Sequence, residues 1–110
     1  MPSTETTVAV VLTTAPDLDT AEDLARTLVG ERLAACVNVM PGVRSVYRFE
    51  GEVHEDAEIL LIIKTGVART GEVAARIKAL HPYDLPEVLV LPTVGGSLPY
   101  LDWVETETAT

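Results

Sequence analysis

The chain of 110 residues carries 17 acidic and 8 basic side chains, so its formal charge at pH 7 is −9. A negative field of that size repels phosphate backbones and anionic lipid surfaces, which argues against nucleic acid and membranes as partners. Although 47% of the residues are hydrophobic, the longest aliphatic runs are far shorter than the ~20 residues that a membrane helix needs.

The first two elements expected along the chain are a strand and a helix. Val8–Leu12 (VAVVL) is rich in β-branched residues and too short for a helix, which predicts a strand followed by a turn at Ala15-Pro16. From Asp17, a candidate N-cap, the apolar spacing becomes helical. The residues expected on one face of this helix are Ala21, Leu24, Ala25, Leu28 and Arg32.

A long β-hairpin is expected next. AACVNVM and VRSVYRF flank Pro41-Gly42, which predicts one strand with a bulge or bend at that dipeptide. Glu50-Gly51 predicts a tight reversal, after which EVHEDAEILLIIKT returns as the partner strand.

The second half of the chain predicts a helix, a strand and a short helical piece. Gly66 and Thr70-Gly71 interrupt the chain, and Pro82 stops the helix that follows. The buried stripe expected on that helix comprises Val73, Ala74, Ile77 and Leu80. VLVL after Pro86 predicts a fourth strand. PYLDWV predicts a short helical segment in which Tyr100 and Trp103 are the anchors. The polar ETETAT predicts a frayed tail.

The element order βαββαβ predicts an α+β fold, the ferredoxin-like sandwich, with a long hairpin between its second and third strands and a short C-terminal helical segment. A single domain over residues 1–110 is expected. One cysteine allows no internal disulfide, and MPSTETT lacks the pattern of a secretory signal. Both features predict a cytoplasmic protein.

The strands themselves predict an oligomer. VAVVL, ILLIIK and VLVL are apolar at consecutive positions, so aliphatic side chains occupy both faces of the sheet. Two helices can cover only one of these faces. Because a bare apolar face of this size is rare on monomers, we expect a homo-oligomer with its sheets facing inward.

Two residues suggest a site, each beside a structural alternative. His81 can cap the end of the second helix or bind a metal, and no His or Cys three or four residues away completes a chelating pair. From the local sequence alone the capping role is favoured. Lys64 shares a strand face with Leu60 and Ile62, so its ammonium either reaches the sheet edge or meets an anion in a cleft.

The remaining candidates are packing or interface residues. Cys36 lies in an apolar strand and is expected to be a buried free thiol. Tyr47, Arg48 and Phe49 form either a packing cluster or an oligomer contact. Since no nucleophile is paired with a base and no catalytic motif occurs, a non-enzymatic protein is expected.

Five segments, in this order along the chain, carry a resemblance to a known family: TTAPD, ERLAACVNVMPGVRSVYRFEG, LLIIKT, LHPYDLPEVLVLP and YLDW. Together they resemble the CutA divalent-ion tolerance proteins, over about Val8 to Val104. The resemblance implies a ferredoxin-like homotrimer, a link to tolerance of copper and other divalent ions, and an architecture like that of the trimeric P-II signalling proteins.

The resemblance also bears on a metal site. Some members of the family carry a cysteine where this chain has Thr13 and a histidine where it has Leu80, and these positions, with His81, are the ones associated with copper. Here only His81 remains as the metal candidate. Because Cu(II) prefers several N and O ligands, one imidazole would need copies of itself or carboxylates from neighbouring subunits.

Two functions follow as alternatives. In the first, a non-enzymatic trimer binds divalent cations such as Cu(II) weakly, helped by its negative charge. In the second, a P-II-like module binds a small anionic effector in an intersubunit cleft and relays its presence to a partner. The residues expected to border that cleft are Lys64, Tyr83, Cys36 and Trp103, with His81 beside them.

Overall fold

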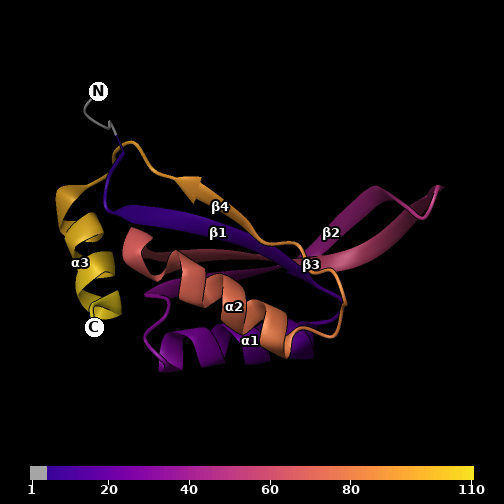
Figure 1. Ribbon diagram of the computed structural model, residues 1–110, viewed down its shortest axis with the longest axis horizontal. Coiled ribbons are helices and arrows are strands. Elements are labelled where there is room, and N and C mark those ends of the chain that lie inside the picture. The colour runs from indigo at the N-terminus through magenta and orange to yellow at the C-terminus, as the bar shows by residue number, and fades with distance from the viewer. Residues whose placement is uncertain (1–4) are drawn as a thin grey trace.

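A four-stranded antiparallel sheet organises residues 5–110, which the computed structural model describes (Figure 1). The strands lie in the order β2-β3-β1-β4, and α1 and α2 cover one face while α3 crosses one end. The element bounds are β1 (Val8–Ala15), α1 (Leu18–Gly30), β2 (Cys36–Phe49), β3 (Glu52–Gly66), a 3-10 turn η1 (Val67–Arg69), α2 (Thr70–Leu80), β4 (Leu89–Pro92) and α3 (Leu98–Thr108). This arrangement confirms the predicted ferredoxin-like sandwich.

The core lies between the helices and the odd-numbered residues of the central strands. Val11 of β1 is paired in register with Ile63 of β3, and both are fully buried. The helices complete this core with Ala21, Leu24, Leu28, Val73 and Ile77. The Asp17 carboxylate accepts a hydrogen bond from the Thr20 amide at 2.8 Å, which confirms the predicted N-cap and lowers the pKa of that carboxyl.

The bulge at Pro41-Gly42 keeps one sheet face continuous. The register passes from Met40 opposite Leu60 to Val43 opposite Glu58, so two residues of β2 oppose one of β3. Gly42 has φ +85°, a left-handed conformation that suits glycine. Beyond the bulge the hairpin projects as an arm from the body of the molecule and reverses at Glu50-Gly51, as predicted (Figure 1).

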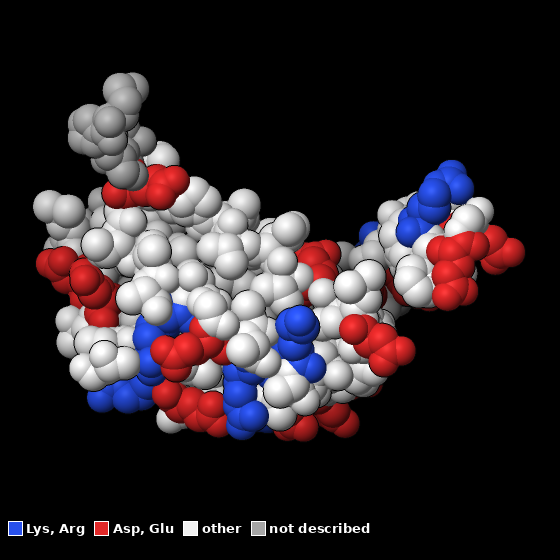
Figure 2. Space-filling view, in the orientation of Figure 1, with Lys and Arg blue, Asp and Glu red and all other residues white. Residues whose placement is uncertain are grey.

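The sheet face opposite α1 and α2 is apolar and has no helix over it. Residues that lie on this open face are Val10, Leu12, Cys36, Asn38, Met40, Leu60, Ile62, Lys64, Leu89 and Leu91. Figure 2 shows uncharged side chains over β1 and β4, whereas charged ones gather on the helices and on the arm. The two-faced apolar pattern of the strands is therefore present in the fold.

The C-terminal prediction was wrong in its extent. The segment expected to fray continues α3 to Thr108, whose hydroxyl donates to Val104 O at 2.9 Å and accepts from the Gly66 amide at 3.2 Å. Arg32 donates to the terminal carbonyls of the helix, which stabilises that end. Val104, fully buried, anchors α3, while Tyr100 and Trp103 are 44% and 43% exposed.

Three smaller expectations also fail. Arg32 lies beyond α1, with φ 61°, rather than on a helical face. Thr70-Gly71 starts α2 instead of interrupting the chain, and Leu80, the last residue of α2, is exposed instead of continuing the buried stripe of Val73 and Ile77. The absence of a secretory signal was inferred partly from residues 1–4, which lie outside the described residues. None of the helices described here has both the length and the apolar character that crossing a membrane requires.

Candidate functional site

His81, immediately after α2, is held between two backbone groups. Its Nε2 lies 2.6 Å from the carbonyl oxygen of Thr14, and the Tyr83 amide lies 3.1 Å from its Nδ1. A carbonyl oxygen only accepts and an amide N–H only donates, so the ring is neutral with its proton on Nε2. The side chain is buried, and the bond to Thr14 ties the end of α2 to the end of β1, while the bond from Tyr83 is local to the segment after α2.

In this geometry His81 already makes one of the two contacts that are typical of a metal-binding histidine. Imidazoles that bind metals usually donate their other N–H to a backbone carbonyl or carboxylate, as Nε2 of His81 does to Thr14. The remaining nitrogen, Nδ1, accepts from Tyr83, so an ion would have to displace that amide. Within residues 5–110 no three His, Cys, Asp or Glu side chains are grouped to hold a metal ion. Metal binding by His81 stays a prediction.

The other two positions that the family resemblance associates with copper, Thr13 and Leu80, differ in burial. The Thr13 side chain is fully buried, and its hydroxyl oxygen has no hydrogen-bond partner within residues 5–110. Leu80 is 40% exposed. Neither side chain supplies a metal ligand of the kind that imidazole would need beside it.

A phenol–carboxylate contact adjoins His81 and a similar one lies on the arm, and neither was expected from the sequence. The Tyr83 ring lies 4.7 Å from that of His81, and its hydroxyl donates to Glu58 at 3.2 Å. Tyr47 donates in the same way to Asp56. Glu58 is buried although it is charged. The sequence signal for Glu58 was its position. It directly precedes the apolar run of β3, and it shares the open face with Leu60, which is two residues further on.

These contacts raise the pKa of both phenols. The hydrogen bond to Asp56, with smaller contributions from burial and nearby charge, raises the pKa of Tyr47 to about 12. Burial, followed by the charge and hydrogen bond of Glu58, raises the pKa of Tyr83. The carboxylates of Asp56 and Glu58 contribute to both shifts, and acidic side chains placed together in this way favour cations over anions.

Lys64 and Cys36 lie side by side on the open face, at the other end of β3. They are directly opposite in register, and the ammonium lies 3.9 Å from the thiol sulfur and donates to the side-chain oxygen of Asn38. Both residues are half-buried, and Cys36 is a free thiol. Lys64 thus keeps its charge near the sheet surface, held by a neutral acceptor.

Of the four predicted cleft residues, Lys64 and Cys36 meet within one chain, whereas Tyr83 and Trp103 lie apart from them. Tyr83 contacts Glu58, whereas Lys64 lies six residues further along β3, a separation of about 20 Å at ~3.3 Å per residue. Trp103 lies on α3 with its ring 5.6 Å from that of Tyr100. A cleft that joins these residues can form only between chains, and it stays a prediction.

The predicted trimer contacts lie on the projecting arm. Tyr47 and Phe49 are 42% and 48% exposed, and both contact the His54 ring, at centroid distances of 5.4 Å and 6.4 Å. Arg48 donates weakly to Gly51 O at 3.4 Å. The arm therefore presents aromatic surface with little of the body beneath it, the kind of surface that interfaces use.

Comparison with known proteins places this chain among relatives of a single type. A family model described as "CutA1 divalent ion tolerance protein" matches residues 9–107. The chain is 50% identical to the divalent-cation tolerance protein CutA of Thermus thermophilus over 99 residues, which cover 90% of this chain and 96% of that one. It is 48% identical to the chloroplastic protein CutA 1 of Oryza sativa, covering 98% of this chain and 62% of that longer protein.

Solved structures of CutA proteins are also similar to this chain. The crystal structure of CutA from Xylella fastidiosa has a TM-score of 0.91 at 43% identity, covering 94% of this chain and 99% of that chain. The divalent cation tolerance protein from Thermus thermophilus has a TM-score of 0.90 at 48% identity, covering 93% and 99%.

Proposed function

The chain belongs to the CutA1 divalent ion tolerance family, and from this premise we propose that it serves tolerance of divalent metal ions as a non-enzymatic homotrimer that binds the ions weakly. The family match over residues 9–107 carries the proposal. Copper is the ion suggested by the resemblance. A formal charge of −9 per chain supports the proposal because it concentrates cations at the surface.

His81 is the proposed ligand, through Nδ1. The bond from Nε2 to the Thr14 carbonyl would orient the ring, and the ion would replace the Tyr83 amide as the partner of Nδ1. Loss of that amide hydrogen bond costs about 0.5–1.5 kcal/mol, which weakens metal binding by roughly twofold to tenfold. Weak binding is thus the expected behaviour of this site.

The trimer is supported by the open face and by the two sheet edges. Leu60 and Ile62 lie on a face that no helix of residues 5–110 covers, and burying such a face against other copies stabilises the assembly. The edge strands β2 and β4 lie at opposite sides of the sheet. Because these edges differ, pairing β2 of one chain with β4 of the next is a head-to-tail contact that can close into a ring.

A second candidate function rests on Lys64. Its ammonium is half-buried on the open face, with a neutral Asn38 oxygen rather than a carboxylate as partner. A small anionic effector in an intersubunit cleft would find its counter-charge there, as the P-II-like alternative requires. Salt separates the two candidates, since surface attraction of cations fades at high ionic strength whereas a specific cleft keeps its stoichiometry.

Isothermal titration of the metal-free protein with Cu(II) and Zn(II), at low and moderate salt, tests the proposal. Saturable binding at one ion per chain or per trimer is expected, and His81→Ala should abolish it. The matched control is His54→Ala, which removes an imidazole from the arm and should leave the binding unchanged. Binding that survives in His81→Ala, or fails in the unmodified protein, would refute the assignment.

A further inference from the structure

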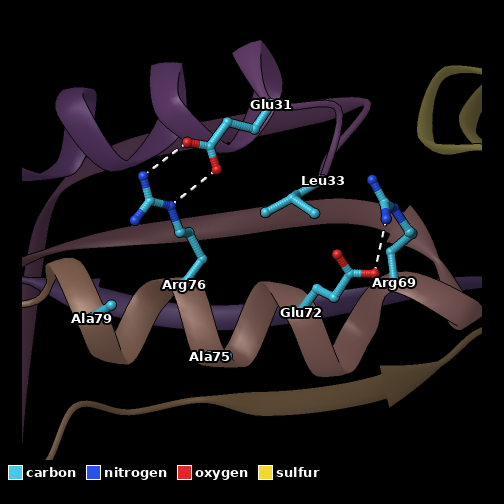
Figure 3. A pocket seen from close by; sticks show the side chains of 7 residues that line it. All are labelled: Glu31, Leu33, Arg69, Glu72, Ala75, Arg76 and Ala79. Atoms are coloured by element: carbon cyan, nitrogen blue, oxygen red, sulfur yellow. Dashed lines mark hydrogen bonds and ion pairs between the residues drawn. The ribbon is translucent and has the colours of Figure 1, made fainter. Parts of the chain in front are cut away.

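A groove of about 440 Å³ opens between the end of α1 and the outer face of α2 (Figure 3). Leu33, Ala75 and Ala79 give it an apolar lining, and an arginine–glutamate pair stands toward each end. Its volume falls within the range of small-molecule sites. The groove belongs to the helix layer, so it is separate from the open sheet face and from His81.

At one end of the groove, the Nε–Nη2 edge of the arginine is paired with a carboxylate. Arg76 donates from Nε and Nη2 to the two carboxylate oxygens of Glu31, at 3.0 Å and 2.8 Å. This bidentate pair joins α2 to the residue that follows α1. A guanidinium engaged in that way by a carboxylate has little capacity left for another anion.

At the other end, the arginine has an acceptor for Nη1 but not for Nε. Arg69 donates from Nη1 to Glu72 at 2.8 Å, and its side chain is 13% exposed. Its Nε is buried and has no hydrogen-bond partner within residues 5–110. The edge formed by Nε and Nη2 is the fork that binds carboxylate and phosphate groups, and a buried charged donor without an acceptor is unfavourable.

The contact that holds Arg69 in this orientation is weak. Glu72 lies three residues away on the same helix, and its side chain is 58% exposed. Because the carboxylate of Glu72 is largely exposed, water competes with Arg69 for it and reduces the contribution of this pair to stability. An oxyanion that replaces Glu72 would reach Nη1 directly, and because Nε is buried, the Arg69 side chain would have to rotate for its Nε–Nη2 edge to face the groove.

We propose that this groove binds a small oxyanion with a short apolar body, with Arg69 as the anion-binding residue and Leu33, Ala75 and Ala79 as the apolar contact. Carboxylates and phosphates share the required chemistry. The formal charge of −9 opposes any anion, so a Kd on the order of 1 mM is expected.

Nitrogen-15 NMR of the full chain tests the site, because the Nε–H of an arginine gives its own signal. Inorganic phosphate and valerate are titrated separately to about 10 mM, a tenfold excess over the expected Kd. The expected result is a saturable shift of the Arg69 Nε–H signal, and the probe that saturates identifies the class of oxyanion. Glu72→Gln should tighten the binding about twofold to fivefold, because it removes the competing carboxylate.

Three variants make the outcome decisive. Arg69→Lys keeps the charge but lacks the fork and should lose the saturable response of the groove amides. Ala75→Glu leaves Arg69 intact but adds a negative charge to the lining, and it should abolish binding as well. Arg44→Lys, on the exposed Arg44–Glu55 pair of the arm, is the control and should bind as the unmodified chain does. No saturation with either probe, or saturation retained in Arg69→Lys, would overturn the proposal and leave water as the partner of Nε.

Discussion

Replacing His81 by alanine removes two hydrogen bonds at once, one of them buried and the other partly buried. The Thr14 carbonyl loses the donor that lies 2.6 Å away, and the Tyr83 amide loses its acceptor at 3.1 Å. Each bond is worth about 0.5–1.5 kcal/mol, and an unpaired buried polar group adds a desolvation cost of about 1–3 kcal/mol. The ring contact between His81 and Tyr83, at 4.7 Å, is lost too.

The expected decrease in the free energy of unfolding is about 2–4 kcal/mol for His81→Ala in metal-free buffer. Urea denaturation at one fixed protein concentration measures it, so that association contributes equally to every variant. His54→Ala is the control, and it should cost less because that ring lies on the arm, where its Nε2 makes an exposed hydrogen bond to the carbonyl oxygen of Phe49 and the ring contacts Tyr47 and Phe49. A loss below about 0.5 kcal/mol for His81→Ala, the range of ordinary surface substitutions, would refute the structural role argued for this histidine.

Three further predictions concern the arm, the open face and the bulge. Asp56→Asn should lower the pKa of Tyr47 from about 12 toward its usual 10, as measured by tyrosinate absorbance, and an unchanged titration would contradict the assigned cause. Because the folded-state pKa is raised, the stabilising effect of that bond is complete below pH 10 and is lost as the pH rises toward about 12. Ile62→Asp places a charge on the open face and should dissociate the proposed trimer at micromolar concentration in sedimentation equilibrium; a trimer that persists in this variant would mean that this face is not the interface. Gly42→Ala forces a residue with a side chain to adopt φ +85°, and urea denaturation should show a free energy of unfolding lower by about 1–2 kcal/mol. An unchanged free energy of unfolding would show that the bulge tolerates other residues.

Much of the fold could be predicted because its local signals agree with its tertiary structure. The reversal at Glu50-Gly51 and the bulge at Pro41-Gly42 both depend on residues that determine their own backbone conformation. The extent of α3 could not be predicted in this way. Its last turn has a polar sequence, and it is ordered by the bond between Thr108 and Gly66 and by Arg32, which are contacts distant in sequence.

The site was harder to predict for the same reason. His81 was recognised as a residue that either caps a helix or binds a metal, but its partner Thr14 becomes visible only when β1 and the end of α2 are brought together. Glu58 was overlooked because a carboxylate beside an apolar run is ordinary in sequence. Its hydrogen-bond partner, Tyr83, reaches it from a different part of the chain.

The central claim is that a divalent ion binds His81 at Nδ1 and displaces the Tyr83 amide. The most direct measurement is the Tyr83 amide signal in nitrogen-15 NMR of the metal-free protein during titration with Zn(II), which is diamagnetic. The account predicts a saturable shift of this signal and faster exchange of its proton with water, because its hydrogen bond to Nδ1 is lost. A Tyr83 signal that stays unchanged while Zn(II) binds to saturation would place the ion elsewhere and contradict the claim.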